Sequence, residues 1–372
     1  MQTPIPTLFM RGGTSHGPFF HEADLPQDLA TRDRVLLAVM GSPDPRQIDG
    51  LGGAHPLTSK VGIVRRSTIP NVDLDFLFAQ LQPDQDTVDT TPNCGNMLAA
   101  VVPFALESGL TQAQAGTTTL RVLTLNTGMQ CDITVRTPGG VLEYEGEARI
   151  DGVPGTAAPI TIDFLDTVGS VCASLLPTGQ VRDRVQVQGE GFEPFAIDVT
   201  CIDNGMPLVI LRAEDLGRTG YESAAELNAD TDLKQRLEAL RLEVSLLMGL
   251  GDVRHKNYPK MTLVAAPRDG GDISTRSFIP HVCHDAIGVL AAVTVGTACV
   301  LQGSVAHAIA GNGEVTTRTV SVEHPSGEFS VELGLDPHDP QKVIRAGLLR
   351  TARLLMRGEA MVPAAVWKGK TA

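Results

Sequence analysis

The chain has 372 residues, of which 42% are hydrophobic and 20% charged, a globular composition that argues against an intrinsically disordered protein. Its formal net charge of −13 and its 4% of aromatic residues argue against a general nucleic-acid binder, which needs a basic surface and stacking aromatic rings. A strongly negative protein also repels anions, so any site for an anionic ligand has to be a local cationic cleft.

No segment of the sequence predicts targeting to a membrane. Residues 1–13 lack the charged start and the long apolar stretch of a signal peptide. The most apolar run, 286–301, contains Gly and Thr and is too short for a confident membrane span. The six cysteines form no CxxC pair, which argues against zinc and thioredoxin-type sites. We expect a reduced, soluble, cytoplasmic protein, and the sequence leaves its oligomeric state open, a homo-oligomer included.

The elements predicted along the chain repeat. Each half contains, in order, a strand that runs into a polar turn, a helix, a strand opened by a lysine, an apolar helix preceded by a cysteine, and a further strand. Because five matches occur in the same order, we interpret them as a duplication of about half the chain. The matched segments are 18–25 with 207–216, 36–44 with 245–252, 59–64 with 259–264, 93–96 with 282–285, and 126–128 with 324–327.

The duplication predicts an α+β fold of two pseudo-symmetric domains. Alternating apolar residues in the strand-rich segments favour antiparallel sheet, and the apolar helix at 286–301 must be buried on all sides. A sheet wrapped around that helix would bury it. We place the domains at 1–182 and 183–355, with a linker near 177–190 and a C-terminal tail, 356–372, that packs on the first domain. In the second domain, a helical face is predicted for Leu233, Leu237, Leu240, Val244 and Leu247.

Cys94, in Asn93-Cys94-Gly95-Asn96, is the first candidate catalytic residue. A cysteine in the first turn of a helix lies near free backbone N–H groups and the positive end of the helix dipole, which favour the thiolate. Gly95 would let a carboxylate approach the backbone closely. The competing interpretation is a small buried residue at a helix cap, with Asn93 as the cap.

Lys60 is the second candidate. It precedes the apolar run VGIV, and burial of its amine in a cleft would favour the neutral form that a general base requires. The alternative is an ordinary lysine at the end of a strand. The duplication matches Lys60 with Lys260 and Cys94 with Cys283, so all four could meet at a cleft between the domains.

A glycine-rich turn near the N-terminus is the third candidate. The segment Arg11-Gly12-Gly13-Thr14-Ser15 offers backbone N–H groups, hydroxyls and a cation to an anion, without the spacing of a P-loop. A plain hairpin turn is the competing interpretation. We expect further carboxylate contacts in the second half, from Arg276, His284, Ser326 and Gly327. We interpret His281 and His324 as structural and Arg353 as a solvated helix residue. No motif for metal-dependent or serine hydrolysis is present.

Taken together, MRGGTS, the lysine of LTSK and the later NCGN resemble the methylaconitate isomerase/methylitaconate isomerase family. The resemblance runs from about residue 5 to 357. It implies a fold like that of diaminopimelate epimerase: two domains, each a β-barrel around a central helix, with the site between them. It also implies no cofactor and no metal, and proton transfer by a lysine and a cysteine that correspond to Lys60 and Cys94.

The resemblance also defines the substrate class. Longer stretches, including RIDGVPG, VTCIDNGMP, RSFIPHVCH and EHPSGEF, indicate a branch of the family that shifts a proton on an unsaturated tricarboxylic keto acid. The expected carboxylate contacts are Arg11, Thr14, Ser15, Asn93, Gly95, Asn96, Lys260, Arg276, Cys283, His284, Ser326 and Gly327. The alternatives are 2-methylaconitate or methylitaconate isomerisation and a non-catalytic tricarboxylate-binding protein. At position 16, where relatives carry lysine, this chain has His16, a weaker cation near neutral pH.

Overall fold

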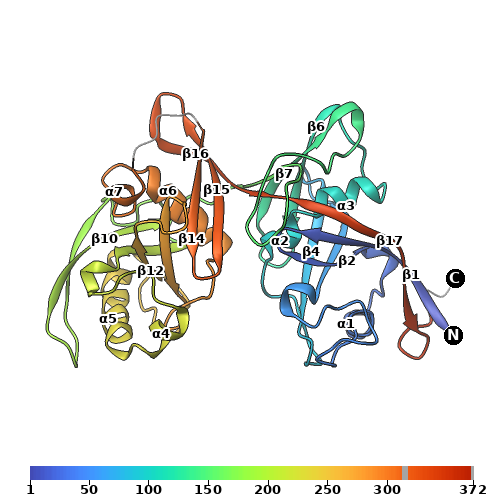
Figure 1. Ribbon diagram of the computed structural model, residues 1–372, viewed down its shortest axis with the longest axis horizontal. Coiled ribbons are helices and arrows are strands. Elements are labelled where there is room, and N and C mark those ends of the chain that lie inside the picture. Colours follow the sequence, from blue (N-terminus) through green and yellow to red (C-terminus); the bar gives the residue numbers. More distant parts are fainter. Residues whose placement is uncertain (312–316, 370–372) are drawn as a thin grey trace. The chain divides into compact units, whose positions relative to one another are not determined.

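The computed structural model describes residues 1–311 and 317–369, a mixed α/β structure that is mostly sheet with few helices (Figure 1). The chain divides into two compact units. Unit 1 comprises Met1–Leu165 and Leu349–Ala372, and unit 2 comprises Asp166–Leu348. Within the described residues, none of the helices combines the length and apolarity that crossing a membrane requires.

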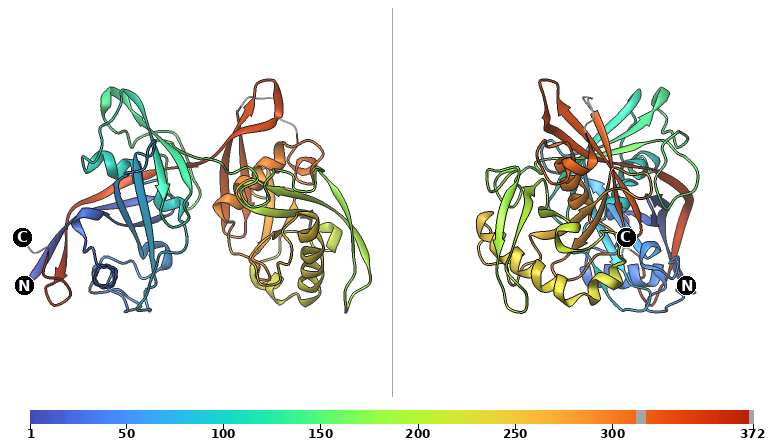
Figure 2. Two further views of the ribbon diagram at one scale, coloured as in Figure 1. Left: turned by 180° about the vertical axis from the view of Figure 1, so that it is seen from behind. Right: turned by 60° about the vertical axis from the view of Figure 1, so that its left-hand side comes forward.

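Unit 1 is built on strands from both ends of the chain. Its strands are β1 (Gln2–Gly12), β2 (Ser15–His21), β3 (Lys60–Arg66), β4 (Leu74–Leu81), β5 (Val88–Asp89), β6 (Gly116–Thr124), β7 (Gln130–Thr137), β8 (Ile160–Phe164) and β17 (Ala352–Pro363). Its helices are α1 (Leu29–Met40), α2 (Gly95–Leu98) and α3 (Val101–Glu107), with short 3₁₀ turns η1 (Glu22–Asp24), η2 (Pro56–Thr58) and η3 (Pro138–Gly140). β17 pairs antiparallel with β1, so the first and last strands of the chain lie side by side (Figures 1 and 2).

Unit 2 repeats this arrangement with longer helices. Its strands are β9 (Asp183–Val187), β10 (Phe195–Asp203), β11 (Pro207–Arg212), β12 (Lys260–Ala265), β13 (Ile273–Phe278), β14 (Thr317–His324) and β15 (Gly327–Asp336), and β16 (Asp339–Arg350) leads back toward unit 1. Its helices are α4 (Ala224–Ala229), α5 (Thr231–Leu247), α6 (Val289–Val300) and α7 (His307–Ala310), with the 3₁₀ turn η4 (Glu214–Leu216).

The two units share one order of strand pairing. In unit 1, β1–β2 is antiparallel, β2–β3 parallel, β3–β4 antiparallel, β4–β6 parallel and β6–β7 antiparallel. In unit 2, β10–β11, β11–β12, β12–β13, β13–β14 and β14–β15 follow the same alternation. Lys60 and Lys260 are the first residues of the corresponding strands β3 and β12. The repeated segments of the sequence therefore occupy matching positions.

The helices follow from capping and apolar patterning. Asp28 caps α1, which ends at Gly41 in the left-handed conformation, and Asp230 caps α5. On α5, four of the five predicted core residues are buried. Leu247 is exposed because the buried face continues through Val244 and Met248, and Leu247 lies on another side of the helix. In α6, every residue from Ala291 to Val300 is buried, against β10, β11, β14 and β15. Burial on all sides agrees with its uniformly apolar sequence.

Two predicted helix starts differ from the structure. The apolar helix expected after Cys94 is two short helices, because Pro103 has no N–H to continue the hydrogen-bond ladder from α2. Cys283 does not open α6, which begins six residues later at Val289. Instead, Cys283 forms an isolated bridge with Phe278, and its N–H donates to Asn228 Oδ1 over 2.7 Å.

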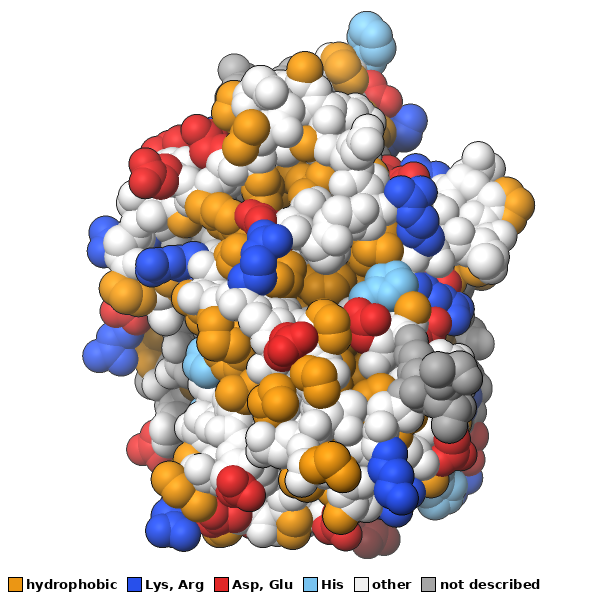
Figure 3. All heavy atoms as spheres, turned by 90° about the vertical axis from the view of Figure 1, so that its right-hand side faces the viewer, with side chains coloured by type: hydrophobic (Ala, Val, Ile, Leu, Met, Phe, Trp, Pro, Cys, Tyr) orange, Lys and Arg blue, Asp and Glu red, His pale blue; other side chains and the backbone are white. Residues whose placement is uncertain are grey.

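The unit boundary and the C-terminal segment also differ in detail from the sequence interpretation. The structure divides the chain between Leu165 and Asp166, before the boundary predicted at 182/183. Residues 166–182 belong to unit 2 because the backbone N–H groups of Val171 and Cys172 donate to the buried Asp203 carboxylate. Within the proposed linker near 177–190, residues from Asp183 onward form β9. Arg353 lies in a strand rather than a helix, because β17 pairs with β1 along its length. Figure 3 shows one face of the molecule, on which hydrophobic and charged side chains are interspersed.

Candidate active site

Lys60 has an environment of neutral oxygens and an aromatic ring. Its side chain is buried, and Nζ donates to Gln80 Oε1 over 2.6 Å. Gln80 is the residue opposite Lys60 in the β3–β4 pair. The Lys60 ammonium also lies 4.9 Å from the centroid of the Phe78 ring, close enough for a cation–π interaction. No carboxylate neutralises this ammonium among the described residues.

The orientation of the Gln80 amide is fixed by its other hydrogen bonds. Gln80 Nε2 donates to the backbone oxygens of Pro56 (3.0 Å), Ser59 (3.2 Å) and Leu81 (2.9 Å). Because the NH₂ group faces these acceptors, the amide oxygen must face Lys60. The amine therefore has a fixed acceptor that carries no charge and does not compete for the proton.

Cys94 is the N-cap of α2, with an extended backbone and a half-buried side chain. Its N–H donates to Asn93 Oδ1 over 2.9 Å, and Gly95 begins the helix. The loop that leads to Cys94 is linked to β4 by Asn126. The amide of Asn126 bonds both the N–H and the C=O of Phe78 and also donates to Thr90 O. One side chain thus ties the strand that carries Phe78 and Gln80 to the segment just before Cys94.

The turn between β1 and β2 packs directly on α2. Asn96 Nδ2 donates to Thr14 Oγ1 over 2.9 Å. A Cβ on Gly12 would lie 2.3 Å from Asn96 O, and one on Gly13, whose φ is +52°, would lie 2.1 Å from Asn96 Oδ1. The glycines are therefore required by this close contact. The structure brings Thr14 and Asn96 together beside Cys94.

Two polar atoms near this turn have no hydrogen-bond partner within the described part of the chain. They are Ser15 Oγ and His16 Nδ1, both buried. Burial lowers the pKa of His16, so the imidazole is neutral near pH 7 and does not supply a cation at this position.

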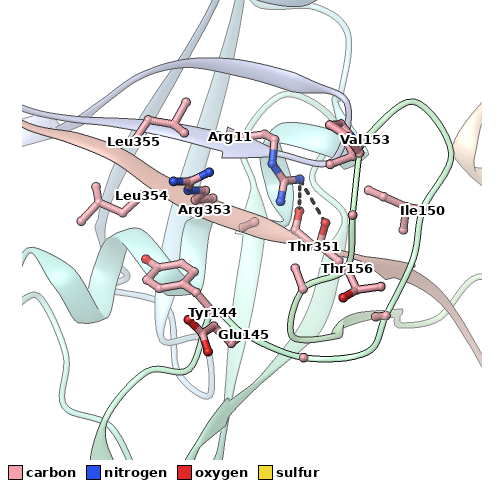
Figure 4. Close-up of a pocket in the computed structure, with 16 residues that line it drawn as sticks. Arg11, Tyr144, Glu145, Ile150, Val153, Thr156, Thr351, Arg353, Leu354 and Leu355 are labelled. Carbon is pink, nitrogen blue, oxygen red and sulfur yellow. Dashed lines mark hydrogen bonds between the residues drawn. The ribbon is translucent and has the colours of Figure 1, made fainter.

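Arg11 turns away to a different place in unit 1. One of its guanidinium nitrogens donates to Gly13 O, Thr351 O and Thr351 Oγ1. The side chain lines a cavity of about 770 Å³ between β1, β17 and the loop around 144–157 (Figure 4). Neither Lys60 nor Cys94 lines that cavity.

The predicted contacts of unit 2 gather around the start of α6. Lys260 Nζ lies 3.5 Å from the position that a Cβ on Gly288, the N-cap of α6, would occupy. Burial lowers the pKa of Lys260. The pKa of His284 is also lowered, mainly by burial and to a smaller extent by the positive charge of Lys260. Ser326 Oγ donates to Asp285 O over 2.6 Å, which ties the turn that contains Ser326 and Gly327 to the segment before α6.

Cys283 and Arg276 form a separate buried pair. Burial raises the pKa of Cys283 to about 11, against the opposing effect of the Arg276 charge, so the thiol is protonated at neutral pH. The Arg276 guanidinium donates to the backbone oxygens of Glu222 and Thr275. Arg276 was predicted to contact a substrate carboxylate, but in the structure its guanidinium is held by these backbone carbonyls.

The sequence interpretation missed Gln80 and Phe78, and it placed Asn126 in a repeated segment without assigning it these contacts. Phe78 and Gln80 act through the register of their strand and belong to no motif. The only available signal was the alternation in LDFLFAQL, which puts Phe78 and Gln80 on one face of a strand. Within residues 1–311 and 317–369, no group of three or more His, Cys, Asp or Glu side chains is arranged to hold a metal ion.

Comparison with known proteins assigns the family. The family described as "PrpF protein" matches residues 2–363. The chain belongs to the PrpF family. Among its PrpF-like relatives, the 4-oxalomesaconate tautomerase of Pseudomonas putida is 53% identical over 369 residues, 99% of each chain. The (4E)-oxalomesaconate Delta-isomerase of a Novosphingobium species is 53% identical over 357 residues, 96% of this chain and 97% of the relative.

The fold of the PrpF family is also seen in a solved relative. The crystal structure of a methylitaconate-delta-isomerase matches this chain with a TM-score of 0.82 and 34% identity, over 98% of this chain and 97% of that one. The 3-methylitaconate isomerase of Eubacterium barkeri is 35% identical over 381 residues, 97% of this chain and 98% of the relative. The matched relatives are thus named as isomerases or tautomerases of small unsaturated acids.

Proposed function

We propose that the protein is a cytoplasmic, cofactor-independent isomerase that shifts a proton on 4-oxalomesaconate, by keto–enol tautomerisation or by 1,3-allylic isomerisation. The observation that carries this proposal is the environment of Lys60, an amine held by a neutral amide oxygen and an aromatic ring. Full-length identity of 53% to two proteins named for this substrate supports the choice of acid. The reaction would serve the degradation of aromatic acids such as gallate and protocatechuate.

The proposed chemistry uses two groups, one that removes a proton from the substrate and one that returns a proton at a different atom. Lys60 would remove an acidic proton from the carbon next to the activated carbonyl, which leaves a delocalised enolate. Cys94 would return a proton at oxygen or two carbons away. Positioned acid–base groups of this kind typically contribute ~10²–10⁴-fold to a rate. Backbone N–H groups at Gly95 and Asn96, with the Thr14 hydroxyl, would stabilise the developing negative charge.

The fold would complete the site by bringing the units together. We propose that each unit is a β-barrel around its central helix and that both close over one substrate. The shared pairing order and the matched lysines at the starts of β3 and β12 support this arrangement. In it, Lys260, His284, Ser326 and Gly327 would bind the substrate carboxylates at the start of α6, with Cys283 lining the site.

Proton exchange with solvent tests the proposed reaction directly. We expect the protein to replace C–H hydrogens of 4-oxalomesaconate by deuterium in D₂O, as followed by proton NMR. Cys94→Ala should slow this exchange by at least about 10²-fold, whereas Cys172→Ala, a change of another half-buried cysteine, should not. Tight binding without any exchange would instead identify a non-catalytic tricarboxylate-binding protein.

A charge change at Gln80 tests whether Lys60 is the base. A carboxylate in Gln80→Glu would lie against the Lys60 amine and stabilise its protonated form. If the neutral amine removes the proton, the rising limb of the pH profile of kcat/KM should move to higher pH. Gln112→Glu adds the same charge at an exposed loop and should leave the profile in place. An unshifted profile in Gln80→Glu would remove Lys60 from the role of base.

Methylaconitate or methylitaconate isomerisation is the second candidate, favoured by the structural match to a methylitaconate-delta-isomerase. It needs the same proton chemistry with a methyl pocket in place of an oxalo pocket. The lower identity of that relative, 34%, places this candidate second. Comparison of kcat/KM on 4-oxalomesaconate and on 2-methylaconitate separates the two, and a preference for the methyl acid would reverse the order.

A further inference from the structure

The cavity that Arg11 lines contains two neighbouring cations. Arg11 of β1 and Arg353 of β17 are directly opposite each other in the antiparallel pair, and both line the cavity of about 770 Å³ (Figure 4). Residues opposite each other in a sheet present their side chains on the same face. The two guanidinium groups therefore share one side of the cavity.

Neither guanidinium is neutralised by a carboxylate. Arg11 donates only to neutral oxygens of Gly13 and Thr351. Arg353 is exposed, and in the part of the chain that is described it makes no hydrogen bond or ion pair. Burial, and then the charge of Arg353, lower the pKa of Arg11, the direction expected for like charges held together. In a protein with a net charge of −13, this is the local cationic cleft that an anion requires.

The rest of the lining suits a small organic acid. Ile150, Val153 and Leu354 give an apolar wall, and Thr156 and Thr351 contribute hydroxyls. The hydroxyl of Tyr144 is buried beside the Glu107 carboxylate, which hydrogen-bonds it. Burial and the nearby Glu107 carboxylate raise the pKa of Tyr144, so its hydroxyl keeps its proton. Glu145, the one carboxylate among the described lining residues, is exposed, as Arg353 is.

We infer that this cavity is a second binding site, for a small polycarboxylate anion held between Arg11 and Arg353. It is distinct from the proposed reaction site, because its lining includes none of Lys60, Gln80 and Cys94. It is nevertheless connected to that site. Arg11 also donates to Gly13 O, and Gly13 packs on Asn96. An anion that binds Arg11 would therefore compete with Gly13 O for the guanidinium and could shift the turn beside Cys94.

Binding stoichiometry tests the inference without relying on turnover. The probe is tricarballylate, a saturated tricarboxylate that cannot undergo the proposed proton shift, titrated into the full-length protein by calorimetry. We expect two equivalents to bind the unmodified protein. Arg353→Gln should weaken one of them by at least about tenfold, the loss expected for a hydrogen bond between charged groups. Arg66→Gln, the same change at an exposed strand end of unit 1, should weaken neither.

A second variant separates this cavity from the reaction site. Lys60→Met should retain the equivalent that depends on Arg353. Equal binding by Arg353→Gln and Arg66→Gln would overturn the inference. Loss of the same bound equivalent in both Lys60→Met and Arg353→Gln would also overturn the inference. The cavity would then be part of the reaction site. Neither outcome alters the deuterium-exchange test of the proposed function.

Discussion

Replacement of Lys60 by methionine is expected to lower kcat on 4-oxalomesaconate by about 10²–10⁴-fold. Methionine has nearly the length of lysine and tolerates an apolar site, so it can fill the space beneath Phe78 without carrying a proton. The change removes the amine that bonds Gln80 Oε1. Steady-state turnover, together with circular dichroism to confirm the fold, measures the effect.

Lys342→Met is the matched control for this loss. Lys342 is exposed on β16 and pairs with Asp336, an interaction worth little at the surface. This variant should retain turnover close to that of the unmodified protein. Near-normal turnover in Lys60→Met would remove Lys60 from the mechanism, whatever happens at Cys94.

Gly17→Ala is expected to destabilise unit 1 by about 3 kcal/mol, the upper end of the range for overpacking. A Cβ on Gly17 would lie 1.8 Å from the backbone oxygen of Lys60. Both atoms belong to paired strands, β2 and β3, so neither can move without breaking the sheet. The same displacement would move Lys60 away from Gln80, so we expect turnover to fall as well.

Chemical denaturation followed by tryptophan fluorescence measures this loss in the unit concerned. The single tryptophan, Trp367, packs against the core cluster of unit 1. Gly358→Ala provides the control, since a Cβ there would meet no atom within 4 Å, and its stability should change by no more than about 0.5 kcal/mol. An unchanged denaturation midpoint for Gly17→Ala would mean that β2 and β3 are more adaptable than their contact indicates.

The sequence predicted those helices and strands that are determined by residues within the same segment. The apolar run of α6, the spacing of leucines on α5 and the lysines at the starts of β3 and β12 were all evident in the sequence. The division of the helix after Cys94 also has a local cause, Pro103, but the error at Cys283 arose because a distant contact decides its conformation. Cys283 was expected at a helix start, but it forms an isolated bridge with Phe278 and its N–H donates to Asn228, and no pattern around Cys283 reveals these partners.

The site itself was predictable only in part for the same reason. Lys60 and Cys94 could be named from motifs, but the role of Gln80 depends on the register of β3 against β4. A shift of one residue would put Gln80 on the other face of the sheet. The cavity beside Arg11 also depends on long-range pairing, because Arg353 joins it only through the return of β17 to β1.

That return of β17 has a consequence for how the protein is made. Unit 2 is one continuous stretch, residues 166–348, inserted into unit 1, whose last strand ends at Pro363. Translation proceeds from the N-terminus, and domains usually fold in that order as they emerge. Because β1 pairs with β17, which leaves the ribosome after all of unit 2, the inserted unit can fold before the unit that contains Lys60 and Cys94.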